Sequence, residues 1–178
     1  TSLFGYGSFD SLSVKNSSIA LFYFALGLPA FSFIKIFSSF LFARHNTKTP
    51  FYFSVFSVII NITISLYFFN KIGFIIIPIA TTISSWLNAL LLLIYLTNKG
   101  YFSIKFDFIK SFLKIIFSTT LTSYIFYQLI NFFNDNLSYD SEYKLLTIIL
   151  LVIITFVIYI LISILTKAFK ISDIKLKY

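Results

Sequence analysis

Polar side chains recur at helical spacing within two otherwise apolar segments of this chain. Between residues 51 and 69, Ser54, Ser57, Asn61 and Ser65 follow one another at intervals of three and four, so they share one helix face. Between residues 74 and 96, one face is shared in the same way by Thr81, Ser84 or Ser85, and Asn88. Such groups hydrogen-bond between neighbouring membrane helices, at about 0.6 to 2 kcal/mol per contact. The two faces predict a polar seam. Asn61 and Asn88 also fit a water-filled path or an ion site, because an amide in hydrocarbon needs partners.

Two lysines within apolar segments are a second candidate for chemistry. Lys35 lies about two turns before the end of one apolar run, and Lys114 lies near the start of another. An ionisable group inside a membrane segment is costly, so it marks a functional candidate by default. Both positions also allow the long side chain to reach the membrane surface. Facing inward, either lysine would offer a positive charge to a phosphate or carboxylate on a substrate.

The residue types give little support to catalysis or to metal binding. His45 is the only histidine, and the chain has no cysteine. The acids are scattered through predicted connectors and the tail, and they are Asp10, Asp107, Asp135, Asp140, Glu142 and Asp173. This pattern contains no nucleophile–base pair and no set of metal ligands. We therefore expect no enzyme activity, no cofactor and no bound metal.

The composition predicts that lipid surrounds the helices. The 178 residues are 58% hydrophobic and 11% charged, whereas soluble proteins carry about 25% charged residues. Runs of about 20 apolar residues recur, which is the length that crosses a hydrocarbon layer of about 30 Å. The net charge of +8 is spread over short connectors instead of one basic face, so nucleic acid is not an expected partner. The predicted fold class is all-α, a polytopic helical membrane protein.

Five membrane spans are predicted, at about residues 19–42, 51–69, 74–96, 112–133 and 145–165. A short interfacial helix is expected ahead of the first span, and a basic cytoplasmic tail over residues 166–178. The second and third spans form an antiparallel hairpin because their connector is short. The fourth is the weakest by hydropathy, since it holds a lysine and several hydroxyl residues. Kinks are expected at Gly27, Pro29 and Pro78, because proline removes a helical hydrogen bond.

Lysine and arginine lie mostly on one side of these spans. The connectors after the first and third spans and the tail together hold nine of them, and the opposite side holds three. Cytoplasmic connectors retain an excess of Lys and Arg. The chain is therefore predicted to start outside and to end in the cytoplasm. Arg44 and Lys48, in the turn after the first span, have ordinary topology-setting charge as their simplest explanation.

Residues 25–50, ALGLPAFSFIKIFSSFLFARHNTKTP, resemble the tenth span and following cytoplasmic loop of the MurJ/MviN lipid II flippases. These flippases belong to the multidrug/oligosaccharidyl-lipid/polysaccharide exporter superfamily. The likeness rests on a GLPAF-like kinked helix followed by an aromatic–x–Arg–x–Asp/Asn–x–x–Thr–Pro turn. Residues 79–96, IATTISSWLNALLLLIYL, resemble the family's twelfth span, and residues 3–10, LFGYGSFD, resemble the segment ahead of the tenth. Beyond about Gly100 only hydropathy and charge agree.

This resemblance implies that residues 1–178 are a carboxy-terminal lobe fragment, holding the last five spans of a fourteen-helix, two-lobe transporter in the bacterial cytoplasmic (inner) membrane. Such proteins alternate between inward-open and outward-open states. They carry the undecaprenyl-pyrophosphate-linked peptidoglycan precursor from the inner to the outer leaflet. The implied partners are this lipid-linked precursor, membrane lipids and the missing amino-terminal lobe of the same chain, whose arginines would hold the pyrophosphate.

The resemblance also assigns roles to particular residues. Arg44 and Lys48 would be gate residues that contact the other lobe or anionic headgroups, and a groove for the lipid tail would fall within residues 112–165. Some family members bind sodium through an Asn, an Asp one turn later and a Thr. By position these would be Asn61, Ser65 and Thr81, and Ser65 lacks the charge that a hard cation favours.

Two alternatives fit the same sequence. A related exporter of the superfamily would move lipid-linked oligosaccharide or cationic drugs, and a cavity that is acidic and aromatic instead of arginine-rich would favour the drugs. A non-transporting membrane scaffold would use the same spans only to hold partners. Polar stripes that line water would argue against the scaffold.

Overall fold

The computed structural model describes residues 11–103, 106–137 and 143–168, and within these ranges every regular element is helical. The all-α membrane fold expected from the sequence is thereby confirmed. The described residues fall into two compact units, one within Gly5–Ser103 and the other within Ile104–Tyr178. The segment of residues 3–10 and the tail from residue 169 onward, both singled out in the sequence, lie outside the described residues.

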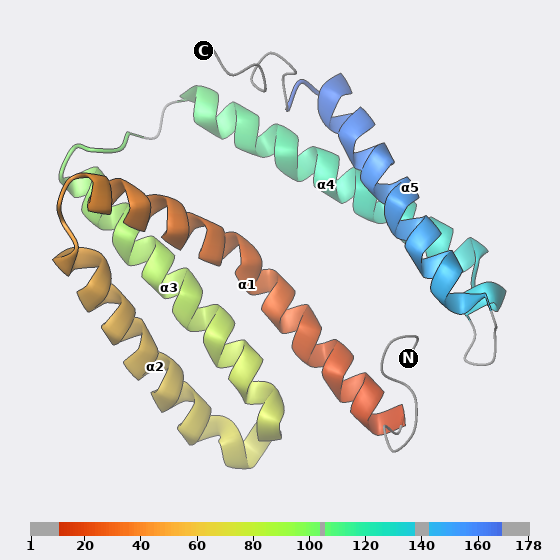
Figure 1. Ribbon diagram of the computed structural model, residues 1–178, viewed down its shortest axis with the longest axis horizontal. Helices are drawn as coiled ribbons and strands as arrows, with labels where there is room; N and C mark the ends of the chain where they lie inside the picture. Colours follow the sequence, from red (N-terminus) through yellow and green to blue (C-terminus); the bar gives the residue numbers. More distant parts are fainter. Residues whose placement is uncertain (1–10, 104–105, 138–142, 169–178) are drawn as a thin grey trace. The chain divides into compact units, whose positions relative to one another are not determined.

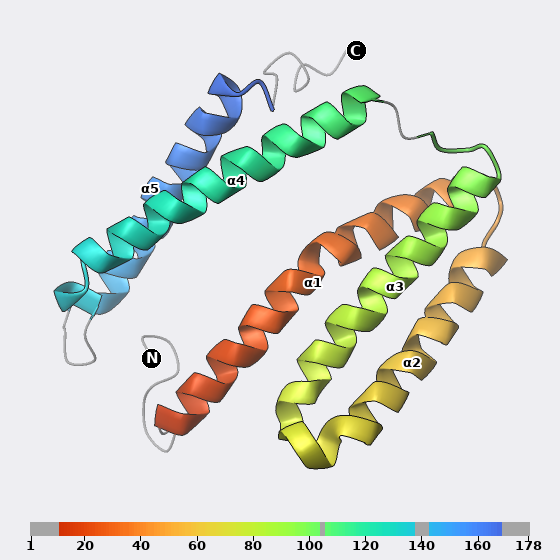
Figure 2. The same cartoon turned by 180° about the vertical axis from the view of Figure 1, so that it is seen from behind.

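The first unit is a three-helix layer. It contains α1 (Ser11–Ala43), α2 (Lys48–Ile72), the short 3-10 turn η1 (Gly73–Ile75) and α3 (Ile76–Asn98). Figures 1 and 2 show α3 lying between α1 and α2, and it packs along the length of both, whereas α1 and α2 contact each other little. Residues on α3 can therefore bond to both neighbours.

The helix α1 is continuous from Ser11, so the interfacial helix expected ahead of the first span is joined to the span itself. No proline or glycine between residues 11 and 19 would interrupt it. Figure 1 shows α1 bending near its middle, which is where Gly27 and Pro29 lie in the sequence. This bend is what a proline within a helix is expected to cause.

Pro78 lies in a different setting from the one expected. The structure places it in the first turn of α3, after the α2–α3 connection at Gly73, which has a left-handed φ of +73°. A proline in the first turn costs no helical hydrogen bond, because the amide it lacks would have no intrahelical partner there. Pro78 therefore helps to begin the helix and does not kink it.

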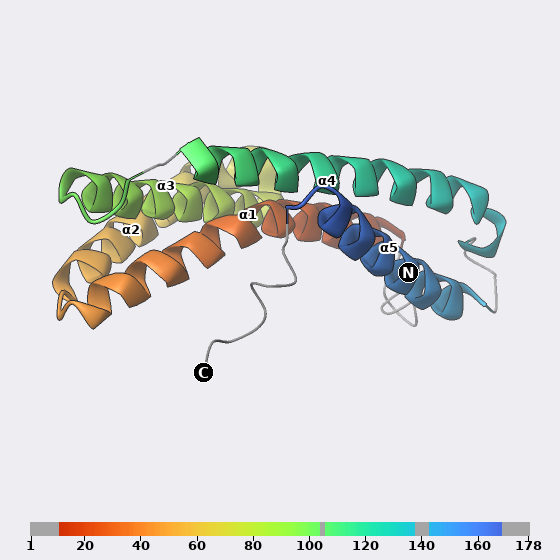
Figure 3. The ribbon, with the colours of Figure 1, turned by 90° about the horizontal axis from the view of Figure 1, so that it is seen from above.

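The second unit is a helical hairpin. It contains α4 (Phe106–Phe132), a 3-10 turn η2 (Asp135–Leu137) and α5 (Lys144–Leu165). The two long helices run antiparallel and cross obliquely (Figure 3). The crossing is polar at one end, where the hydroxyls of Ser118 and Thr166 lie 2.9 Å apart. Small polar side chains of α4 and α5 are buried, namely Ser118, Thr122, Thr147 and Ser163. Side chains of this size let membrane helices approach closely.

Most large apolar side chains face outward. In the first unit the buried hydrophobic cluster consists of Leu41, Leu92 and Leu96. Exposed leucines include Leu66 and Leu165, with exposed fractions of 73% and 81%. Water would not favour such surfaces, and contiguous exposed apolar surface of this extent is typical of contact with lipid or with further protein.

Helices occupy all five positions predicted as spans. Three stretches are long and apolar enough to cross a membrane by length and composition, namely Leu12–Ala43, Lys48–Asn98 and Lys144–Leu165. The second contains the connection at Gly73 and so comprises both α2 and α3. The helix α4 falls short of that standard, in keeping with its low predicted hydropathy. Its crossing of the membrane stays a prediction.

Candidate functional site

The polar faces of α2 and α3 meet in the structure. The Asn61 side-chain amide donates to the hydroxyls of Thr81 at 3.1 Å and Ser84 at 3.3 Å. Further along the same seam, the Asn88 amide donates to the Ser54 hydroxyl at 3.4 Å. The spacing read from the sequence thus brings these side chains together across the hairpin, as it predicted. Their mutual bonds satisfy polar groups that hydrocarbon would leave without partners.

Two oxygens of this seam have no hydrogen-bond partner among the described residues. They are the Asn88 Oδ1 and the Ser65 Oγ atoms. Asn88 is deeply buried, with an exposed fraction of 6%. A buried oxygen without a donor is costly. These two atoms are the least satisfied part of the seam.

The residues at the family's ion position include no charged ligand for a sodium ion. Asn61 uses its amide hydrogens on Thr81 and Ser84, and Ser65 supplies a neutral hydroxyl. Residues 11–103 contain no Asp or Glu, so no carboxylate is available in the described part of this unit. Hard cations prefer charged oxygen ligands. The described seam therefore offers a cation only neutral oxygens, and the absence of a sodium site stays a prediction.

A second set of polar contacts joins α1 to α3. The Thr82 hydroxyl donates to the Tyr23 carbonyl at 2.6 Å, and the Trp86 indole N–H donates to the Leu26 carbonyl at 3.1 Å. Gly27 allows this approach, since a Cβ atom there would lie 3.2 Å from the Thr82 Oγ1 atom. The sequence offered no signal for the role of Thr82, because a hydroxyl within an apolar helix does not reveal its acceptor.

The turn between α1 and α2 is held by backbone and side-chain bonds. Helix α1 ends in a Schellman motif: the Asn46 N–H donates to the Leu41 carbonyl at 2.9 Å, and the His45 N–H donates to the Phe42 carbonyl at 2.9 Å. His45 adopts the required left-handed φ of +59°. Asn46 then accepts from the Thr49 N–H at 3.2 Å and donates to the Tyr95 hydroxyl at 3.1 Å. The sequence identified this segment as a turn but did not identify Asn46 as its anchor.

Arg44 stacks on aromatic rings at this turn. Its guanidinium carbon lies 4.8 Å from the ring centre of Phe40 and 4.2 Å from that of Tyr101, which follows α3. Cation–π contacts of this kind contribute about 0.5 to 1 kcal/mol each at exposed sites. The stack positions the guanidinium and leaves its edge available, because the side chain is exposed. Tyr101 is a further residue that sequence reasoning missed.

The three candidate lysines are all exposed. Lys35 lies on α1, Lys48 opens α2, and Lys114 lies on α4. The hydroxyl of Ser118 bonds to the Lys114 backbone carbonyl, but the lysine side chain itself points outward from the hairpin. Lys35 and Lys48 belong to the first unit, and Lys114 belongs to the second.

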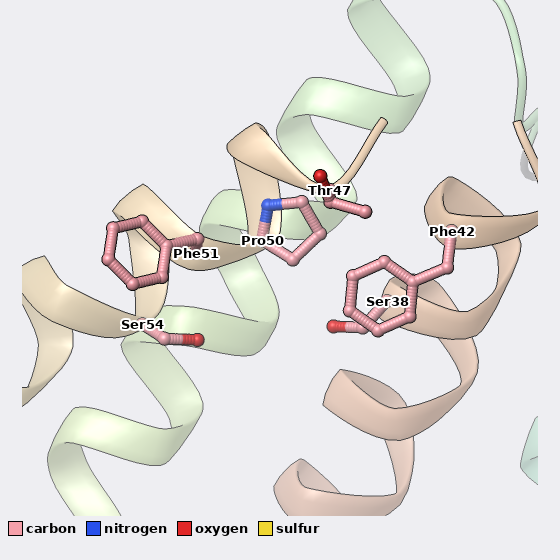
Figure 4. Close-up of a pocket in the computed structure, with 6 residues that line it drawn as sticks. All are labelled: Ser38, Phe42, Thr47, Pro50, Phe51 and Ser54. Carbon is pink, nitrogen blue, oxygen red and sulfur yellow. The ribbon is translucent and has the colours of Figure 1, made fainter. Parts of the chain in front are cut away.

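A pocket of about 430 Å³ lies between the ends of α1 and α2 beside the turn. Figure 4 shows its walls facing each other across the gap between the two helices. It is lined by Ser38, Phe42, Thr47, Pro50, Phe51 and Ser54. The pocket connects to the seam, because Ser54 is the residue that accepts from Asn88.

Apolar helices with outward-facing hydrophobic residues and polar groups held between helices define a polytopic α-helical membrane protein. Comparison with known sequences identifies the family. The family model described as lipid II flippase MurJ matches residues 1–148. The chain belongs to the MurJ lipid II flippase family.

Individual relatives agree with this assignment. A protein of Rickettsia prowazekii named "Probable lipid II flippase MurJ" is 33% identical over 145 residues, which cover 82% of this chain and 28% of the relative. The "Lipid II flippase MurJ" of Thermosipho africanus is 31% identical over 154 residues, covering 86% of this chain and 29% of the relative. A Rhizobium meliloti relative is 37% identical over 99 residues, which cover 56% of this chain and 18% of the relative. The chain thus spans less than a third of the length of these curated relatives.

Proposed function

We propose that this chain forms the carboxy-terminal part of a lipid II flippase, which moves an undecaprenyl-pyrophosphate-linked peptidoglycan precursor from the inner to the outer leaflet by alternating access. The observation that carries the proposal is the family match over residues 1–148. Relatives named as lipid II flippases support it. The bacterial cytoplasmic (inner) membrane is the location that this activity requires.

The described residues would serve this activity as scaffold and gate. The α2–α3 seam and the α1–α3 contacts would keep the first unit together as one body. Arg44 would act at the cytoplasmic face, where its aromatic stack presents a fixed positive charge to the other lobe or to anionic headgroups. The pyrophosphate itself would be held mainly by the amino-terminal lobe.

Reconstitution of the full-length protein tests the proposal. Liposomes would contain fluorescent lipid II, and the fraction that an external quencher reaches would be followed over time. We expect the protein to bring inner-leaflet lipid II into reach of the quencher, well above the rate in protein-free liposomes. Movement of a lipid-linked oligosaccharide but not of lipid II would favour the related exporter, and movement of neither would favour the scaffold.

A further inference from the structure

The pocket beside the α1–α2 turn combines apolar walls with hydroxyl groups. Phe42, Pro50 and Phe51 supply the apolar walls. Figure 4 shows the hydroxyls of Ser38 on α1 and Ser54 on α2 pointing toward the gap between the helices, with Thr47 above them at the turn. Polar groups thus approach the same space from both helices, which is the arrangement of a site for a ligand that is polar at one end and apolar at the other.

The hydroxyl donors of this pocket are not used within the described residues. Many helix hydroxyls bond to the carbonyl four residues earlier, as Ser57 does to Phe53 at 2.9 Å. Ser38 makes no such bond, Thr47 makes no capping bond, and the Ser54 oxygen only accepts from Asn88. Because a hydroxyl can donate while it accepts, three O–H groups are free to bind an acceptor. The pocket therefore favours a ligand rich in acceptor oxygens.

The charges around the pocket favour a negative ligand. Lys48 directly follows Thr47, and Lys35 lies three positions before Ser38, which places it on the same face of α1. Both lysine side chains are exposed. The sequence from residue 11 to 103 contains no acid that would neutralise them. Arg44 stacks on the rings of Phe40 and Tyr101. Among the described residues, the cations that flank the pocket are therefore Lys35 and Lys48.

The position of the pocket along α1 indicates a lipid as the source of that anion. Helix α1 has 33 residues and is therefore about 50 Å long, whereas the hydrocarbon layer is about 30 Å thick. Its ends must reach into the headgroup layers. Ser38 lies five residues before the end of α1 at Ala43, a rise of about 8 Å. With α1 centred on the hydrocarbon layer, this depth is close to where the acyl chains meet the headgroups.

We propose that the pocket binds the headgroup phosphate of an anionic phospholipid in the leaflet at this end of α1, the cytoplasmic one by the predicted orientation. Ser38, Thr47 and Ser54 donate to the phosphate oxygens. Lys35 and Lys48 supply the positive charge, and an acyl chain runs along Phe42 and Phe51. A site for a membrane phospholipid goes beyond the proposed function, which concerns the transported precursor.

Native mass spectrometry of the detergent-purified full-length protein tests this site. The protein would be titrated with phosphatidylglycerol and with phosphatidylethanolamine of the same acyl chains. We expect tighter binding of phosphatidylglycerol, and about tenfold weaker binding of it in Lys48→Gln and in Lys35→Gln, because a hydrogen bond to a charged group is lost. The matched control is Lys71→Gln, which removes the same charge at the far end of α2, where Lys71 lies over the Tyr67 ring.

A pocket-filling variant separates the site from general surface charge. Ser38→Leu leaves every lysine in place and fills the space between the helices, so we expect it to remove the preference for phosphatidylglycerol. Its thermal unfolding should match that of the wild type. Equal binding of the two lipids by the wild type, or an equal loss in Lys71→Gln, would overturn the proposal. Because the readout is lipid binding, a failure here leaves the transport assay untouched.

Discussion

Arg44 is the residue where geometry bears most directly on the proposed transport. Its guanidinium is fixed between Phe40 and Tyr101, yet the side chain is exposed and belongs to no buried core. Its removal should therefore leave folding nearly intact. Arg44 would instead position the turn and contact the other lobe or the anionic headgroups that face it.

We expect Arg44→Ala to slow lipid II movement by about fivefold, because the positive charge that the aromatic stack holds at the turn is lost. The measurement is the liposome assay on the full-length protein, compared with the amount of protein inserted in the membrane. Arg44→Lys keeps the charge and is the control for the planar stack. A loss of inserted protein equal to the loss of movement would reduce Arg44 to a topology-setting charge.

Gly27 lies where α1 and α3 approach each other closely. A side chain at this position would meet the Thr82 hydroxyl at 3.2 Å and the Phe31 ring at 3.3 Å. We expect Gly27→Val to destabilise the protein by about 1 to 3 kcal/mol through overpacking. The measurement is thermal unfolding in detergent, with Ala25→Val on the exposed side of the same helix as control. Equal stability of the two variants would show that α1 and α3 do not meet at this glycine.

Some contacts of individual residues could be predicted from the sequence, and others could not. Spacing predicted that Asn61 and Thr81 share a seam, because both lie on regular polar faces of helices joined by a short turn. Spacing could not predict that Thr82 and Trp86 bond to carbonyls of α1, since main-chain acceptors have no sequence signature. Nor could it predict the left-handed conformation of His45, a position that glycine usually takes.

At the scale of elements, the α2–α3 hairpin depends on cooperation between its two polar faces. Asn61 bonds to both Thr81 and Ser84. Since each helix is apolar on its other sides, these bonds fix the register of the pair more than they add to its stability. Hydrogen bonds between membrane helices contribute about 0.6 kcal/mol on average and at most about 2 kcal/mol.

A double-mutant cycle on this hairpin measures the seam directly. We expect Asn61→Ala and Thr81→Val to show a coupling of about 0.6 to 1.7 kcal/mol in the unfolding free energy of the full-length protein. The matched pair is Asn61→Ala with Thr63→Val, because the Thr63 hydroxyl is exposed and bonds only to its own helix. That pair should couple by nearly zero. Equal coupling in the two cycles would contradict a specific seam.

Elements were predicted better than their packing. The five apolar runs correspond to helices because each run is long enough to satisfy its backbone bonds internally. The pairing of α2 with α3 followed from their short connector. The larger contact, between α1 and α3, joins segments separated in the sequence by the whole of α2, so hydropathy alone could not place it. The Ser118–Thr166 contact of the α4–α5 hairpin was missed for a related reason, since Thr166 lies just beyond the predicted fifth span.

At the scale of the whole molecule, the distribution of charge predicts the orientation in the membrane. We expect alkaline phosphatase to be active when fused in the 70–73 connector and inactive when fused after Tyr178, because the enzyme folds only outside the cytoplasm. A fluorescent protein at the same two positions should show the opposite pattern. Activity of both phosphatase fusions would mean an even number of crossings between them and would remove one of α3, α4 and α5 from the spans.

A measurement in living cells tests the transport proposal, which rests on the family assignment. The most direct measurement is to deplete the full-length protein and to quantify the lipid II that is accessible at the outer leaflet. We predict that accessible lipid II falls while lipid II accumulates inside, and that the wild-type gene restores both. Unchanged accessible lipid II, in cells shown to lack the protein, would contradict the proposal that this protein is the cell's lipid II flippase.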